Sequence, residues 1–406
     1  MLNVLWVIDH VCYDGSLHGG GRLYWNVLPQ FDADRVRVVP CLLRANELIR
    51  QVFAKSQAPV RILNKGTFDP TTLWTLLRLI KTEQIDVMHL HCFASSTFGR
   101  LASAMTGVPA VIHDYDTEVY FPYPAYLWLT DWMLAPLARL AIAASPMVRN
   151  FLMRKRRIDR VRIRTMFHAI PSEHFAAVSA ERIRAVRSRV GAGPQTRVVG
   201  TVTKLGPQRG TEVLLQAAAQ VVQRIPDALL LIFYQPTRFH RLPNQKYVDV
   251  SGRDQTNVAE LETLARTLGI ERHVRFIELP EDLDAWVAAC DLIVAPFLSE
   301  RFSSVQLLEA MAKGKPVIAT DLGESQELIS DGIDGYLVPP GDVTALGRRI
   351  ARLLSDTEAR ERMGRAARAT AARHSVEAYA RSLEQLYQEI AENGHHATAA
   401  RTETAR

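Results

Sequence analysis

The feature that most constrains the fold is the alternation of short β-branched runs with segments of helical period, which continues through both halves of the chain. This alternation is typical of βαβ units, and strands of a parallel sheet read as continuous apolar runs because helices cover both faces. In the first half, strands are expected at 4–8, 36–43, 60–63, 86–90, 110–113, 140–144 and 161–166. In the second half, they are expected at 198–202, 228–233, 247–250, 274–277, 292–295, 317–319 and 336–338. The pattern predicts an α/β protein with two similar, doubly wound Rossmann-like domains.

The length of 406 residues suits two or three domains. A stretch rich in Ser, Ala, Arg and Gly ends in GAGPQT, whose Gly and Pro are expected to break any regular element. Apolar residues recur at helical spacing after residue 375, and the last residues are small and polar. The predicted segments are an N-terminal domain over 1–172, a linker over 173–196, a C-terminal domain over 197–374, a terminal helix over 375–390 that packs back on the N-terminal domain, and a disordered tail over 391–406.

Composition narrows the class of protein. A net charge of +6 favours anionic ligands or an anionic membrane surface but is low for a dedicated nucleic-acid binder, so no nucleic-acid partner is expected. Cys12, Cys41, Cys92 and Cys290 form no CxxC pair, which indicates reduced thiols in the cytosol. The apolar region 127–144 contains Thr, Asp, Pro and Arg, so no lipid-spanning helix is expected. We predict a cytoplasmic protein, soluble or peripheral to a membrane.

The segment ERFSSVQLLEAMAKGKPVIATD follows a predicted strand and enters a helix near Ser303 or Ser304, which are good N-caps. Free amides at a helix N-terminus, beside the carboxyl end of a strand, suit a pyrophosphate. Glu309 lies further along the helix, where its carboxylate can accept hydrogen bonds from ribose hydroxyls. The alternative is an ordinary capped helix with a surface glutamate.

The segment TKLGPQRG follows the first strand of the second half. Lys204 and Arg209 flank a Gly-Pro turn, and two cations at a strand-to-helix loop can clamp a diphosphate. The alternative is a solvated basic loop.

The segment DGSLHGGGR contains the glycines Gly19, Gly20 and Gly21, which let the backbone approach a ligand closely. Tyr24 stands where the last glycine of a dinucleotide fingerprint would fall, so an NAD site is not indicated. The alternative is a flexible loop.

His89, His91 and His113 end two predicted neighbouring strands, and such residues point into the crevice where parallel sheets bind ligands. The alternative is a set of structural histidines.

Together these segments, with EAMAKGKPVIAT and DGIDGYLVPPGD, resemble the retaining glycosyltransferases of family 4, which have the GT-B fold of two domains facing a cleft. The resemblance extends to about Ile390. It implies that the N-terminal domain binds the acceptor and the C-terminal domain binds a nucleotide sugar, UDP- or GDP-linked.

The resemblance also assigns residues. Those implied for the donor are Lys204 and Arg209 on the diphosphate, with the two cations exchanged relative to the family, Ser303, Ser304 and Val305 at the distal phosphate, and Glu309 on the ribose. Those implied for catalysis are His113 on the transferred sugar and Glu300, with Lys204 and Arg209, while Gly19, Gly20, Gly21 and His91 line the acceptor side.

Two positions depart from the family pattern. Arg301 stands eight residues before Glu309, where the family has its first acid, and Glu300 is one residue out of step. Either a bulge brings Glu300 into place or another group contacts the sugar. His168 replaces the usual Asn.

The implied reaction retains anomeric configuration by a front-face mechanism in which the leaving phosphate takes the acceptor proton. Lys204, Arg209 and the helix amides would stabilise the leaving diphosphate, and neither a metal nor a cofactor is expected. The implied setting is bacterial polysaccharide, lipopolysaccharide or glycolipid assembly.

Seven aromatic residues lie within 115–132, and a basic run over 149–164 contains Asp159 as its one acid. Aromatics beside basic residues suit the inner face of an anionic cytoplasmic membrane, so we expect docking onto a lipid-linked acceptor. The alternatives are a core aromatic cluster and a solvated basic helix.

Other function classes remain open. A sugar-nucleotide epimerase or hydrolase would keep the nucleotide site, and a non-catalytic nucleotide-binding protein would bind without turnover. A metal-dependent transferase would use Asp-x-Asp, a spacing found at Asp114 and Asp116 and at Asp32 and Asp34.

Overall fold

The computed structural model describes residues 1–13, 16–17, 19–45, 60–115, 127–235, 239–241, 247–249, 258–299 and 305–404. The chain divides into two compact units. The first unit comprises Met1–Ala169 and Val376–Arg406, and the second comprises Ile170–Ser375. Both units are parallel-sheet α/β domains, as the strand pattern predicts.

The sheet of the first unit has seven parallel strands in the order β5-β4-β1-β6-β7-β8-β9. The strands are β1 (Leu2–Ile8), β4 (Val36–Leu42), β5 (Arg61–Ile62), β6 (Val87–His91), β7 (Ala110–Asp114), β8 (Leu140–Ala143) and β9 (Ile163–Thr165), with a short hairpin of β2 (Cys12–Tyr13) and β3 (Ser16–Leu17). The helices are α1 (Gly19–Val27), α3 (Thr71–Thr82), α4 (Phe93–Thr106), α5 (Leu127–Leu134), α6 (Pro146–Arg154) and α15 (Val376–Thr404). Every strand predicted for this half is present. The order reverses between β1 and β6, which is where doubly wound sheets bind ligands.

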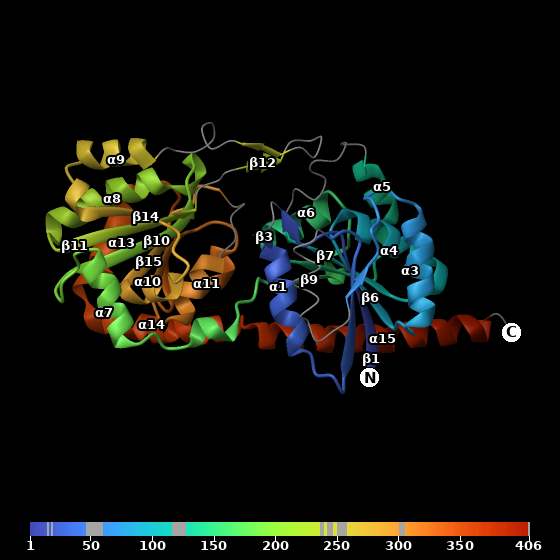
Figure 1. Cartoon of the computed structure of the whole chain (residues 1–406). Coiled ribbons are helices and arrows are strands. Elements are labelled where there is room, and N and C mark those ends of the chain that lie inside the picture. Colours follow the sequence, from blue (N-terminus) through green and yellow to red (C-terminus); the bar gives the residue numbers. More distant parts are fainter. Residues whose placement is uncertain are drawn as a thin grey trace. The chain divides into compact units, whose positions relative to one another are not determined.

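The two faces of this sheet bury separate apolar layers, as strands covered on both sides require. In β1, Val4, Trp6 and Ile8 pack toward α1 and α15. Leu5 and Val7 point the other way, toward α3, α4 and α6. Helix α15 runs along the first unit and contacts β1 and β6 (Figure 1).

The sheet of the second unit has six parallel strands in the order β14-β11-β10-β15-β16-β17. The strands are β10 (Arg197–Lys204), β11 (Ala228–Gln235), β14 (Val274–Glu278), β15 (Leu292–Ala295), β16 (Val317–Thr320) and β17 (Gly335–Val338). The helices are α7 (Ala180–Arg189), α8 (Thr211–Arg224), α9 (Val258–Thr267), α10 (Leu283–Ala289), α11 (Val305–Ala312), α12 (Ser325–Leu328), α13 (Val343–Ser355) and α14 (Thr357–Ala372). The strand expected at 247–250 exists as β13 (Tyr247–Asp249), but it pairs with β12 (Phe239–Arg241) in a separate antiparallel ribbon. Here the order reverses between β10 and β15.

Three expectations about local structure are wrong. The segment predicted as a linker contains α7, which begins after the N-cap Ser179 and belongs to the second unit. This helix can form because the Gly and Pro of GAGPQT lie beyond its end. The last helix does not stop at Ile390, where the tail was predicted to begin. Helix α15 continues to Thr404, since extending an established helix costs much less free energy than nucleating one. The three glycines are not a loop but the first turn of α1.

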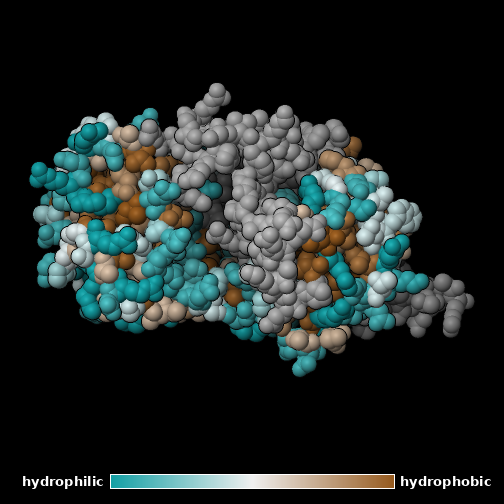
Figure 2. Space-filling model, viewed as in Figure 1, coloured by the Kyte–Doolittle hydropathy of each residue, from teal (hydrophilic) through white to brown (hydrophobic). Residues whose placement is uncertain are grey.

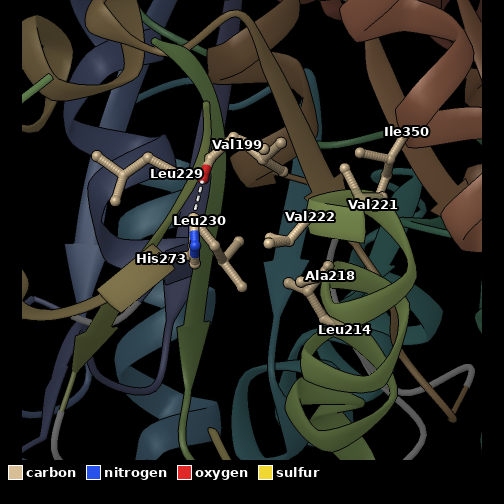
Figure 3. Close-up of a pocket in the computed structure, with 10 residues that line it drawn as sticks. Val199, Leu214, Ala218, Val221, Val222, Leu229, Leu230, His273 and Ile350 are labelled. Atoms are coloured by element: carbon tan, nitrogen blue, oxygen red, sulfur yellow. Dashed lines mark hydrogen bonds between the residues drawn. The ribbon is translucent and has the colours of Figure 1, made fainter. Parts of the chain in front are cut away.

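An apolar recess lies between α8 and the strands β10 and β11 (Figure 3). Its free volume is about 10 Å³, scarcely enough for one water molecule. The polar side chain in its lining is His273, whose Nδ1 lies 3.0 Å from the Ala228 carbonyl oxygen. The recess is therefore part of the core of the second unit and offers no chemistry.

Among the residues that the structure describes, no helix combines the length and apolarity needed to cross a membrane.

Candidate functional site

The reversal point of the second sheet carries the two predicted cations. Lys204 ends β10, and Arg209 ends the short 3-10 helix Pro207–Arg209 that follows. The loop is tied to the end of β15 by a 2.9 Å hydrogen bond from the Leu298 amide to the Gln208 carbonyl. Gly210 then starts α8 with a φ of +70°, and a Cβ there would lie 1.8 Å from the Pro296 carbonyl oxygen. Only glycine permits this close approach of the cation loop to β15.

Lys204 and Arg209 repel each other electrostatically. Desolvation lowers the pKa of Lys204, and the Arg209 charge lowers it further. Burial also lowers the pKa of Arg209, whose guanidinium lies 5.5 Å from the centre of the Phe297 ring. Among the described residues, no carboxylate forms an ion pair with Lys204. Two cations held together in this way favour a bound anion.

Glu309 lies about one turn into α11, with its side chain 23% exposed. Its Oε1 is 3.9 Å from His174 Nε2, and the other ring nitrogen of His174 lies 3.0 Å from an oxygen of Asp284. Lys313 is 2.7 Å from the second oxygen of Asp284. Sequence reasoning missed His174, which approaches Glu309 only through the fold.

The predicted catalytic residue Glu300 and the predicted donor residues Ser303 and Ser304 lie outside the described residues, as does Arg301. Val305, the remaining predicted donor residue of this segment, is the first residue of α11 that the structure describes.

The glycines Gly19, Gly20 and Gly21 open α1 in the first unit. A Cβ at Gly21 would lie 2.3 Å from the Val11 carbonyl oxygen, so α1 packs directly against the backbone that follows β1. The N-terminus of α4, also at the reversal point, is already occupied: the carboxylate of buried Asp9 accepts hydrogen bonds from the Ala94 and Ser95 amides at 2.9 and 2.7 Å. Sequence reasoning missed Asp9, although its place after β1 is a signal for such a role.

His89, His91 and His113 come together in the core of the first unit, each at most 1% exposed. One nitrogen from each lies within 4.8 Å of the others. His89 Nε2 is 3.2 Å from His113 Nδ1, and Tyr379 Oη is 3.3 Å from His113 Nε2. Burial lowers the pKa of all three imidazoles, so they are neutral at physiological pH. The predicted sugar contact, His113, thus has both ring nitrogens engaged by protein groups.

His168, which replaces the family Asn, lies near this cluster. Its ring centre is 5.9 Å from that of Tyr115, and burial lowers its pKa to about 4. Its Nδ1 has no hydrogen-bond partner among the described residues.

The aromatic and basic segments divide between core and surface. Trp128 and Trp132 on α5 are 50% and 37% exposed, whereas Tyr115 packs on His113; the aromatics at 120, 121, 123 and 126 lie outside the described residues. Figure 2 shows apolar surface where Figure 1 places α5. The basic run is not wholly solvated: Arg156 is fully buried and pairs with Asp131 and Asp114, because α6 ends against the interior of the unit.

Comparison with known proteins gives consistent matches in both halves. A family model described as "Glycosyl transferases group 1" matches residues 183–370, and one described as "Glycosyltransferase Family 4" matches residues 18–174. A D-inositol 3-phosphate glycosyltransferase of Corynebacterium urealyticum is 35% identical over 222 residues, which are 54% of this chain and 49% of that protein. The chain therefore spans about half the length of this relative.

Solved structures match nearly the whole chain. A glycosyltransferase of Rickettsia africae superposes with a TM-score of 0.76 at 17% identity, covering 97% of this chain and 99% of that one. HepE of Anabaena, solved in complex with UDP, superposes with a TM-score of 0.73 at 21% identity, covering 96% and 100%. At these identities the structures establish the GT-B fold.

Proposed function

Because the chain belongs to the group 1, family 4 glycosyltransferases of the GT-B fold, we propose that it transfers a sugar from a nucleoside-diphosphate donor to an acceptor. The observation that carries the proposal is the pair of cations Lys204 and Arg209 at the reversal point of the second sheet, with no carboxylate paired to Lys204 among the described residues. The UDP complex of HepE supports a nucleotide sugar as donor.

In this proposal the second unit binds the donor nucleotide. Lys204 and Arg209 hold the diphosphate, Glu309 accepts hydrogen bonds from the ribose, and the amide of Val305 at the start of α11 faces the distal phosphate. Ser303, Ser304 and Glu300 have the roles that the resemblance implies. The donors are UDP- or GDP-sugars.

The reaction separates a diphosphate from an oxocarbenium-like sugar. Charge therefore develops on the phosphate oxygens, where fixed cations and amides stabilise it more than they stabilise the ground state. The leaving phosphate takes the acceptor proton on the same face, so configuration is retained and no protein base is needed. This suits His113, which is neutral and held at both nitrogens.

We also propose that the reaction needs no metal. Of the Asp-x-Asp candidates, Asp114 is buried and paired with Arg156, so that carboxylate is committed to a structural ion pair. Full turnover in excess chelator is the expected result; loss of turnover restored by Mg²⁺ or Mn²⁺ would contradict it.

The test begins with calorimetric titration of UDP, GDP and ADP into the protein in chelator. We expect selective binding of one nucleotide, weakened about ten- to a hundredfold by Lys204→Ala or Arg209→Ala. Arg266→Ala, which removes an exposed cation on α9 of the same unit, is the matched control and should bind like the wild type. Unchanged affinity in both site variants would contradict the diphosphate assignment.

Product analysis then separates the enzyme classes. Sugar transferred to an acceptor supports the proposal, and retention is read from the anomeric coupling of the product. Free sugar or an epimer released without acceptor indicates a hydrolase or epimerase. Binding without turnover of any donor and acceptor indicates a non-catalytic protein.

For the acceptor side, we propose docking of the first unit on an anionic membrane that carries a lipid-linked saccharide. Leu129 and Met133 join Trp128 and Trp132 on α5, exposed by 46% and 64%. Arg157 lies 5.5 Å over the Trp132 ring, which places a cation beside the apolar surface. Interfacial tryptophans next to cations suit anionic headgroups.

Vesicle co-sedimentation tests this docking. We expect binding to vesicles with anionic lipid at low salt, weakened by the double change Trp128→Ser and Trp132→Ser. Ile333→Ser, at an apolar residue of the second unit with 65% exposure, serves as the control. Absence of binding by the wild type would contradict the docking and leave the donor site untouched.

A further inference from the structure

We propose that Tyr387 and Tyr379 of α15 are positioning residues for His113. They hold His113 in its Nε2–H tautomer through a chain of hydrogen bonds in which every donor points the same way. The proposal rests on the proposed function in so far as His113 contributes to sugar transfer. The chain itself is a property of the first unit.

The direction begins at Trp6, whose indole nitrogen can only donate. Trp6 Nε1 donates to Tyr387 Oη at 2.8 Å. Among the described residues, the other group at hydrogen-bond distance from that hydroxyl is His89 Nδ1, at 2.6 Å. Because the Tyr387 proton needs an acceptor, it goes to His89 Nδ1. This nitrogen therefore carries no proton of its own.

A neutral imidazole has one N–H group, so His89 must carry its proton on Nε2. That nitrogen lies 3.2 Å from His113 Nδ1, with the two ring planes only 2° apart. His89 thus donates to His113 Nδ1, and the proton of His113 must lie on Nε2. Tyr379 Oη, 3.3 Å away, accepts it.

The same direction determines where the Tyr115 proton lies. Its hydroxyl lies 3.1 Å from His113 Nδ1 and 3.2 Å from His91 Nδ1. The lone pair of His113 Nδ1 is already used by His89, so the Tyr115 proton goes to His91 Nδ1. His91 is then also an Nε2–H tautomer, and its Nε2 has no partner among the described residues.

This assignment of protons requires that the three histidines are neutral, and their burial makes them so. Desolvation lowers the pKa of His89 to about 3. Desolvation, reinforced by repulsion from neighbouring imidazoles, lowers the pKa values of His91 and His113 well below the ordinary value. Among the described side chains, no carboxylate lies within hydrogen-bond or ion-pair distance of these rings.

The consequence concerns α15. The chain enters this helix after the second unit is complete, yet two of its hydroxyls set the proton positions of a cluster on β6 and β7. His113 is therefore not a proton-transfer group. It is a fixed neutral ring, and its orientation depends on Tyr379, which lies 266 residues further along the chain.

Nuclear magnetic resonance of protein with ¹⁵N-labelled histidine tests the tautomers directly and needs no substrate. Long-range ¹H–¹⁵N correlations should show Nε2–H for His89, His91 and His113, assigned by their loss in single His→Gln variants. An Nδ1–H signal for wild-type His89 or His113 overturns the proposal. So does a shift of all three resonances on adding one equivalent of Zn²⁺, which would make the cluster a metal site.

Tyr387→Phe removes the first proton of the chain without touching His113. We expect His89 and His113 to show mixed tautomers and kcat to fall about tenfold with KM for the donor unchanged. Tyr336→Phe, the same change at a buried tyrosine of the second unit, should leave tautomers and kcat at their wild-type values. Unchanged tautomers in Tyr387→Phe overturn the proposal. If the tautomers behave as expected but no transfer is found with any donor, the proposed function fails and the hydrogen-bond chain stands.

Discussion

At the scale of single residues, two glycines show how backbone contact builds the site. Gly21 lets α1 lie against the backbone that follows β1, and Gly210 lets the cation loop lie against the end of β15. In each unit, a glycine thus stands at the start of a helix that packs against backbone at the carboxyl end of the sheet. These backbone contacts determine where the side chains of the neighbouring loops and helices lie.

Gly210→Ala is expected to destabilise the protein for two reasons. A positive φ costs an alanine about 1–2 kcal/mol, and the Cβ would clash with the Pro296 carbonyl. Gly269→Ala isolates the first cost, because its φ is also +70° and no atom lies within 4 Å of the added Cβ. Urea unfolding should give a free-energy loss for Gly210→Ala that exceeds that of Gly269→Ala by at least about 1 kcal/mol. Equal losses would show that the loop can move away.

The lowered pKa of Lys204 predicts proton uptake on nucleotide binding. In the free protein, desolvation and Arg209 disfavour the charged amine. A bound diphosphate favours it and raises the pKa again, so at a pH somewhat below the ordinary lysine value of about 10.4 binding should take up a fraction of a proton. Calorimetry at pH 9 in buffers of different ionisation enthalpy measures this uptake. Lys204→Gln should abolish it, and an equal buffer dependence in that variant would assign the proton elsewhere.

At the scale of elements, four buried charges join α4, α5, the segment that follows α6 and the end of β7. Asp131 on α5 pairs with Arg100 of α4 and with Arg156, which also pairs with Asp114. These side chains are at most 1% exposed, so each charge depends on its partners for compensation. The network fixes α5, with its exposed tryptophans, to the residue that follows His113.

Asp131→Asn should therefore cost about 3–5 kcal/mol of unfolding free energy, since it leaves two buried guanidinium groups short of charge. Asp282→Asn is the matched change in an exposed pair, with Arg182 at 2.6 Å and both side chains at least 50% exposed. It should cost no more than about 1 kcal/mol. Chemical denaturation of both variants makes the comparison, and a small loss in Asp131→Asn would mean that water reaches the cluster.

At the scale of the whole molecule, the first unit is closed by the last helix of the chain. Seven residues of α15, namely Val376, Tyr379, Ala380, Leu383, Leu386, Tyr387 and Ile390, are at most 7% exposed and complete one apolar layer of the first sheet. Buried Glu384 of the same helix accepts the Asp32 amide at 2.7 Å. The second unit, by contrast, is continuous in sequence from Ile170 to Ser375.

A fragment of residues 1–169 should therefore be unstable alone, with an exposed apolar face that binds the dye ANS and without fixed tertiary packing. A peptide of residues 376–404 added in trans should restore near-ultraviolet circular dichroism. The fragment 170–375 should unfold cooperatively by itself. A stable, ANS-silent 1–169 fragment would show that α15 is dispensable to the first core.

The sequence by itself determined the strands of the two parallel sheets, because each such strand is buried on both faces and must be a local apolar run. It also placed the cation loop, since Gly and Pro act within a few positions. The sequence contains the helix-forming residues of α7, but the Gly and Pro that follow them led to the prediction of a linker. The tertiary structure alone decided that Arg156 is buried, that His174 meets Glu309, that Asp9 caps α4 and that the hydroxyls of α15 reach His89 and His113. These contacts join residues distant in sequence, and their energies depend on burial and direction, which exist only once the sheets have formed.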